Sequence, residues 1–223
     1  MPICNGISCE IIDSGSGGNA VVLNEMVLID CGVPFKSIQE YVPNLKLVLL
    51  THIHGDHFKR STIRRLANDR PMLRFGCGRW LVEPLARCGV ALDKIDVLED
   101  GKLYGYGICN VIPVPLSHDV PNQGYKIHFK NGKVIYCTDT GNLNGIEAKW
   151  YDLYLIEANY TDTEIEQRIA DRKESGEFSY EIRVKRDHLS RAQADDFIYS
   201  NIGSNGSYIY MHAHEDKQRG EIV

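Results

Sequence analysis

Three histidines and an aspartate follow directly on an apolar run in the segment "LLTHIHGDHFK", residues 49–59. Side chains two positions apart on an extended chain point to the same face, so His52 and His54 can reach one point. The glycine that follows allows a tight turn toward Asp56 and His57. Imidazole and carboxylate groups at such short spacing are typical ligands of zinc, manganese or iron. A polar surface loop is the alternative, but three of the eight histidines fall in this segment.

The composition indicates an ordinary globular protein. A chain of 223 residues is long enough to bury a sizeable core, and we interpret residues 1–223 as a single domain. The seven cysteines are scattered without a CxxC pair, which favours reduced thiols and a cytoplasmic location. No apolar run has the length of a membrane helix, and we expect neither a signal peptide nor a membrane partner. The net charge of -5 argues against broad, non-specific affinity for nucleic acid.

Short apolar segments of strand type come in two groups, separated by helical patterns. We expect strands at residues 7–12, 20–23, 26–30, 45–51, 95–98, 108–114, 125–129, 134–138, 152–158 and 207–211. We expect helices at residues 61–68, 79–87, 163–173 and 190–202. Asn131-Gly132 indicates a hairpin turn, and Ser190 with Gln193 indicates a capping box. This order predicts an α/β fold in which two sheets pack together with helices outside.

Further candidate ligands stand at the ends of apolar strands. His118 lies in "PVPLSHDVP", Asp139 in "VIYCTDTGN" and His212 in "YIYMHAHED". Strand ends on a rigid scaffold can direct side chains into one cleft. A lone histidine at a strand end is more often a structural residue, and the set gains weight only as a whole. His128, inside "YKIHF", lacks this context, and we interpret it as a structural or surface residue.

The motif "THIHGDH", followed by His118, Asp139 and His212, resembles the metallo-β-lactamase superfamily. The segments "SGSGGN" (14–19) and "VLIDCG" (27–32) also resemble its opening strands. The resemblance covers nearly the whole chain. It implies an αββα sandwich of two mixed β-sheets with helices on the outer faces, and a dinuclear metal centre at one edge.

The resemblance also implies a distribution of metal ligands. His52, His54 and His118 would hold one ion; Asp56, His57 and His212 would hold the second; Asp139 would bridge the two. His214 is the alternative to His212, which we prefer because it follows the apolar strand directly. We expect two divalent ions, most simply Zn²⁺, with Mn²⁺ or Fe²⁺ as alternatives. Two such cations make hydroxide available near neutral pH from a water between them.

Two later segments resemble the RNase Z-like phosphodiesterases, and most closely the YycJ (WalJ)-type branch. "LYLIEANY" places Glu157 at a strand end, and "KRDHLSRAQA" places His188 before a helix. The resemblance implies a catalytic set of Asp56, His188 and Glu157, in which His188 is the general acid and Glu157 orients it. A strand-end acid and a neighbour of a helix cap are the structural alternatives.

The segment "IRVKRDH" places basic residues just before His188. If it is extended, Arg183 and Lys185 share one face and can bind a substrate phosphate. A solvated basic strand explains the same pattern equally well.

The substrate stays open between a cyclic nucleotide and the end of a single strand of RNA or DNA. We find no candidate for the long arm of tRNA-processing RNase Z enzymes and no β-CASP domain. The motif at His212 reads His-Ala-His-Glu, where the YycJ (WalJ)-type branch usually has His-Leu-Ser followed by Asn residues. These departures favour a nucleotide or a short nucleic acid. A thioester or lactone hydrolase of the same fold and a non-catalytic metal-binding protein are the alternatives. A homodimer also stays open, since dimers are common in the superfamily.

Overall fold

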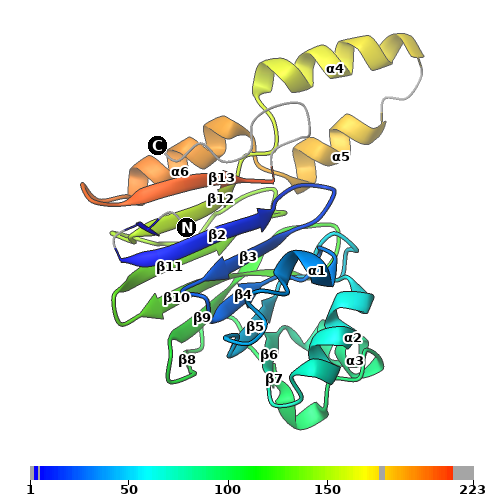
Figure 1. Ribbon diagram of the computed structural model, residues 1–223. Coiled ribbons are helices and arrows are strands. Elements are labelled where there is room, and N and C mark those ends of the chain that lie inside the picture. The colour runs from blue at the N-terminus through cyan, green and yellow to red at the C-terminus, as the bar shows by residue number, and fades with distance from the viewer. Residues whose placement is uncertain (1–2, 5, 176–178, 213–223) are drawn as a thin grey trace.

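The structure of the chain is a computed structural model that describes residues 3–4, 6–175 and 179–212 (Figure 1). The described residues form two sheets that pack face to face. The first sheet has the strand order β1-β2-β3-β4-β5-β6-β7, with the bounds Ile3–Cys4, Ile7–Asp13, Ala20–Leu23, Val27–Ile29, Leu47–Leu50, Arg74–Cys77 and Ile95–Val97. The strands from β1 to β4 pair antiparallel, and those from β4 to β7 pair parallel.

The second sheet is also mixed. Its order is β13-β12-β11-β10-β9-β8, with the bounds Ser207–Met211, Leu153–Glu157, Gly132–Cys137, Asn122–Phe129, Asn110–Leu116 and Tyr104–Gly105. The strands from β8 to β11 pair antiparallel, whereas β11, β12 and β13 are parallel. The four strands β9, β11, β12 and β13 therefore all run in the same direction.

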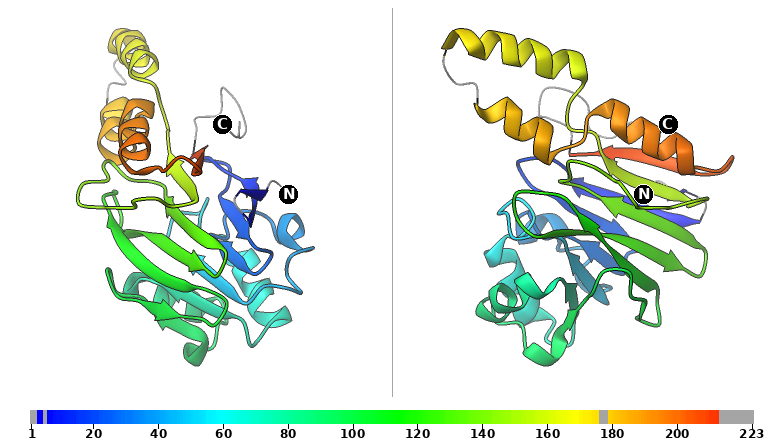
Figure 2. Two further views of the ribbon diagram at one scale, coloured as in Figure 1. Left: turned by 90° about the vertical axis from the view of Figure 1, so that its left-hand side faces the viewer. Right: turned by 180° about the vertical axis from the view of Figure 1, so that it is seen from behind.

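The core lies between the sheets, where alternate side chains of both sheets meet, among them Leu49, Tyr125 and Leu155. The helices α1, α2 and α3 (Phe35–Ile38, Arg60–Asp69 and Val82–Arg87) cover the outer face of the first sheet. Helix α6 (Arg191–Asn201) covers the outer face of the second sheet (Figure 2). The expected αββα sandwich with two mixed sheets is confirmed.

Several local predictions are confirmed as well. The strands at residues 20–23 and 207–211 have the expected bounds. The hairpin between β10 and β11 forms, but Phe129 pairs with Gly132, so Lys130 and Asn131 make the turn. Ser190 caps α6, and its capping box with Gln193 is complete on both sides. Strand β6 was not predicted, because its sequence Arg-Phe-Gly-Cys contains an arginine and a glycine and shows no apolar run of strand type.

Helices α4 (Asp162–Ser175) and α5 (Ser179–Asp187) extend beyond the ends of the strands (Figure 1). They are joined to the body by a small apolar cluster in which Tyr160 and Ile165 contact Val184. Among the described residues, no helix combines the length and apolar character that a membrane crossing requires.

Candidate metal centre and active site

The candidate ligands meet at one edge of the sandwich, because each follows the carboxyl end of a strand. The loop that carries His52 to His57 follows β5, and His118 follows β9. Asp139 and His212 follow the parallel strands β11 and β13. Carboxyl ends of parallel strands lie at the same edge of a sheet, and such edges are common ligand sites. Residues separated by 160 positions in the sequence are thereby brought together (His52 to His212).

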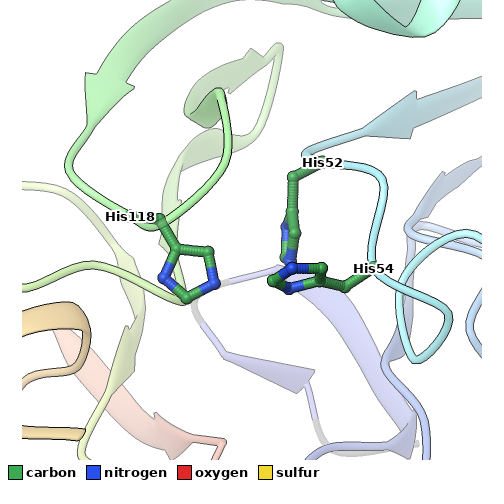
Figure 3. A group of neighbouring side chains, drawn as sticks. All are labelled: His52, His54 and His118. Atoms are coloured by element: carbon green, nitrogen blue, oxygen red, sulfur yellow. The ribbon is translucent and has the colours of Figure 1, made fainter. Parts of the chain in front are cut away.

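Three histidines form the first group of the site. His52 and His54 come from the loop after β5, and His118 comes from the loop after β9 (Figure 3). The ring centroid of His52 lies 4.8 Å from that of His54 and 5.2 Å from that of His118. One ring nitrogen of each lies within 4.8 Å of the others, a spacing that a single cation can span.

The second group consists of Asp56, His57 and His212, whose ligand atoms also lie within 4.8 Å of one another. Oδ2 of Asp56 is 3.7 Å from Nε2 of both histidines. Asp139 lies between the two groups: Oδ2 is 3.0 Å from Nε2 of His57, and Oδ1 is 4.0 Å from Nε2 of His118. His214 lies outside the described residues.

The donor atoms of this cluster fit a metal ion. Nδ1 of His118 donates to the carbonyl of Asp187 at 3.2 Å, which leaves its Nε2 as an acceptor. Nε2 of His118, of His52 and of His212 is buried without a hydrogen-bond partner. Buried polar atoms are normally paired, so these three unpaired nitrogens indicate missing partners. Cations held by the two groups would supply those partners, since His52 and His118 belong to the first group and His212 to the second, and the cluster can therefore bind metal ions.

The protonation states also favour a cation. Burial, together with the charge of His57, lowers the pKa of His52, which keeps its ring neutral as a ligand must be. Burial raises the pKa of Asp139, but the positive charges of His212 and His57 outweigh it and hold that pKa well below its ordinary value. Burial lowers the pKa of His57, but Asp139 and Asp30 outweigh it and raise that pKa. Protons on these histidines thus balance the carboxylates, and metal binding would displace them.

Asp30 is a functional candidate that the sequence analysis missed. It is fully buried behind His57, and its Oδ2 accepts a hydrogen bond from Nδ1 of His57 at 2.7 Å. Its Oδ1 accepts from the backbone and the hydroxyl of Thr51 at 2.9 and 3.0 Å. A carboxylate behind a ligand histidine fixes the tautomer and directs Nε2 toward the site. Its position after the strand in "VLIDCG" was the available signal.

The backbone is strained where the site is built. Asp30, Asp139 and His212 have positive φ values of 61°, 57° and 53°. Residues with a Cβ rarely adopt this region, and when they do they cluster at functional sites. All three side chains are buried and belong to the cluster or support it. The strained positions therefore coincide with the candidate ligands and the residue behind them.

His188 and Glu157 form a pair beside the second group. Nδ1 of His188 lies 2.6 Å from Oε1 of Glu157, which is fully buried at the end of β12. Oε2 of Glu157 accepts from the backbone of Thr140 at 2.9 Å, so the carboxylate is held in place. Burial lowers the pKa of His188, but the hydrogen bond and charge of Glu157 outweigh it and raise that pKa to about 9. His188 is thus protonated at neutral pH, as a general acid must be.

Five of the candidate ligands line a pocket of about 270 Å³, namely His54, Asp56, His118, Asp139 and His212. Its lining includes Asp56, His188 and Arg183, but not Lys185. We expected Arg183 and Lys185 to share a face if their segment is extended. The segment is instead helix α5, so they do not. Residues two apart on a helix do not face the same way. Asp119, also missed from the sequence, lines the pocket with Oδ1 3.2 Å from Nε2 of His118.

His128 lies apart from this pocket. Its Nε2 is 2.7 Å from the hydroxyl of Tyr151, to which it is hydrogen-bonded. This contact agrees with the structural role predicted for it.

The turn expected at Gly55 forms, since the backbone N–H of His57 donates to the carbonyl of His54 at 3.0 Å, but a second glycine also shapes the metal loop. Gly55 has no left-handed φ, and a Cβ added to it would meet nothing within 4 Å. A Cβ on Gly32, in contrast, would lie 1.6 Å from the carbonyl oxygen of Asp56. That carbonyl also accepts from the backbone of Asn19 at 2.6 Å, so the loop cannot easily move away. Gly32 is therefore the residue that allows the metal loop to pack against the strand end.

We expect Gly32→Ala to lower the free energy of unfolding by about 3 kcal/mol, at the upper end of the cost of overpacking. Gly55→Ala, in the same loop region, should change it by less than about 0.5 kcal/mol. Urea denaturation of both metal-free variants checks this. Equal stability of the two variants would mean that the chain relaxes around Gly32.

The comparisons with known proteins agree with this geometry. The family model of the beta-lactamase superfamily domain matches residues 25–192, which is most of the chain and most of the cluster. The chain belongs to the beta-lactamase superfamily. Over 170 residues it is 24% identical to the exodeoxyribonuclease YycJ of Bacillus anthracis, covering 70% of this chain and 64% of that protein's length.

Solved structures support the fold of this superfamily member. The metallo-beta-lactamase fold protein YhfI of Bacillus subtilis superposes with a TM-score of 0.75 at 14% identity, covering 95% of this chain and 88% of the other. The short form of human tRNase Z superposes with a TM-score of 0.66 at 16% identity, covering 92% of each chain. At such identities the likeness shows the fold alone, and it confirms the metallo-β-lactamase fold.

Proposed function

We propose that this chain is a dinuclear metal-dependent phosphodiesterase that acts on nucleotides or on the ends of single-stranded nucleic acids. The observation that carries the proposal is the convergence of two ligand groups and the His188–Glu157 pair on one pocket. The likeness to an exodeoxyribonuclease and to a tRNase Z supports phosphodiester bonds as the substrate class.

In this proposal His52, His54 and His118 would hold one divalent ion. Asp56, His57 and His212 would hold the second, and Asp139 would serve as a ligand shared by the two. Nitrogen and carboxylate donors fit Zn²⁺ best, with Mn²⁺ or Fe²⁺ as alternatives. Bound divalent ions of this kind activate water at neutral pH and neutralise charge on the phosphoryl group.

The chain's own residues supply the proton and position the substrate. His188 gives the proton on Nε2 to the leaving oxygen, while Nδ1 keeps its hydrogen bond to Glu157. Glu157 thereby fixes the ring orientation and holds the ring in its protonated form. Arg183, which lines the pocket, binds a non-bridging phosphate oxygen. Asp56 contributes to catalysis as a proposed ligand of the second ion. Lys185 lies on another side of α5 and does not line the pocket with Arg183.

The test offers the metal-loaded protein 3′,5′-cyclic nucleotides and short single-stranded RNA and DNA at equal concentration, with products identified by mass spectrometry. Asp56→Ala serves as the blank, since it removes a ligand of the second ion. We expect linear mononucleotides or shortened strands from the wild type and about 10³-fold less product from the variant, as for loss of metal-assisted chemistry. Hydrolysis of thioesters or lactones, with no phosphodiester cleaved, would contradict the proposal.

A further inference from the structure

One wall of the pocket is a face of helix α5. Tyr180, Arg183 and Val184 all line the pocket, and they are spaced three and four positions apart, so they share this face. Tyr180 lines the pocket and is 45% exposed, so part of this residue is accessible to solvent. Ile182 is also exposed, at 49%, but does not line the pocket. Tyr180 and the proposed general acid His188 therefore line the same pocket.

The charges of the pocket restrict what can lie along this wall. Four of its lining residues are acidic: Asp56, Asp119, Asp139 and Asp187. Among the described lining residues, Arg183 is the one lysine or arginine. An anionic group outside the metal cluster is therefore held best next to Arg183. One turn of helix away, Tyr180 offers an aromatic face to whatever is attached to that group.

Val184 anchors this face of α5 in a small apolar cluster. It is only 7% exposed and packs with Tyr160 and Ile165 in the cluster that joins α4 and α5 to the body. The position of α5 relative to the pocket is thus set by buried contacts. A binding residue can select substrates only if its distance from the reacting phosphate is fixed.

We propose that Tyr180 is a stacking platform for an unpaired nucleobase, placed one helical turn from the phosphate contact of Arg183. The proposal rests on the proposed phosphodiesterase function and narrows its substrates to nucleotides with a free base face. Aromatic side chains stack on any base, because every base has a π-face. A base inside a duplex is already stacked on both sides, so a cyclic nucleotide or an unpaired strand end fits and a duplex interior does not.

The experiment compares matched substrates with and without a base on the metal-loaded protein. One pair is adenosine 3′,5′-cyclic phosphate and the base-free ribose 3′,5′-cyclic phosphate. The other pair is a short single-stranded DNA with an ordinary end and one with an abasic end. In Tyr180→Ala, the ratio of kcat/KM between base-bearing and base-free substrates should fall ~10-fold or more, mainly through KM. Tyr180→Phe, which keeps the ring, should restore the ratio, and Ile182→Ala is the control on the other face of α5.

The two substrate pairs distinguish a cyclic nucleotide from a strand end as the source of the base. A base preference absent in the wild type, or a ratio unchanged in Tyr180→Ala, would overturn the platform while base-free hydrolysis still supports the phosphodiesterase. If no phosphodiester is cleaved, the proposed function fails, and calorimetric binding of adenosine monophosphate decides separately on the platform. Binding weakened ~10-fold in Tyr180→Ala would support it, and equal binding by both proteins would overturn it.

Discussion

Replacing His188 with alanine should lower kcat by about 10²–10⁴-fold on a nucleotide diester, the usual contribution of a general acid. Nδ1 of His188 is committed to Glu157 at 2.6 Å, and the pKa of about 9 keeps the ring protonated near neutral pH. An alkoxide leaves poorly without a proton, whereas 4-nitrophenolate leaves without one. The loss should therefore be much smaller on a 4-nitrophenyl diester. Steady-state kinetics on both substrates measures the difference.

The metal content of the His188→Ala variant distinguishes a general acid from a metal ligand. His188 lies near Asp139 and His212, and its ring could take part in metal binding. We expect His188→Ala to keep the metal content of the wild type by elemental analysis. His128→Ala is the matched control, because His128 is bonded to Tyr151 outside the pocket. Unchanged turnover of the nucleotide diester, or loss of metal, would remove His188 from the role of general acid.

The candidate ligands could be recognised because each stands at a distinctive place in the local sequence. His52 to His57 crowd into one loop, and His118, Asp139 and His212 each follow an apolar strand directly. A strand's apolar pattern shows where it ends, and the parallel order of the last strands places these ends together. The αββα sandwich followed from the same pattern together with the family resemblance.

Other features depend on contacts that no local pattern carries. Asp30 matters because it lies behind His57, a residue 27 positions away. Gly32, and not Gly55, is required because the carbonyl of Asp56 approaches it across the loops. The segment around Arg183 alternates polar and apolar residues as a strand does, yet it forms helix α5. Packing of Val184 against Ile165 stabilises the helix. Tertiary contact decided each of these positions.

Asp30→Ala should lower the free energy of unfolding of the metal-free protein by about 3–5 kcal/mol, as breaking one side of a buried charged pair does. Asp30 is fully buried, and its carboxylate accepts hydrogen bonds from His57 and Thr51. Alanine leaves those donors unpaired and leaves a charge on His57 without its nearest partner. Urea denaturation followed by circular dichroism measures the loss.

Asp69→Ala is the control, because Asp69 pairs with Arg65 on the exposed side of α2 and such pairs contribute about 0–1 kcal/mol. Asp30→Asn tests the electrostatic part, since it keeps the shape and removes the charge. It should still weaken metal binding by about 10–100-fold, the usual cost of losing a carboxylate behind a ligand histidine. A loss of less than about 1 kcal/mol in Asp30→Ala would mean that His57 is neutral in the metal-free protein. In that case His57 would carry no positive charge to balance the carboxylate of Asp139. Metal binding would then release fewer protons than it would from a protonated His57.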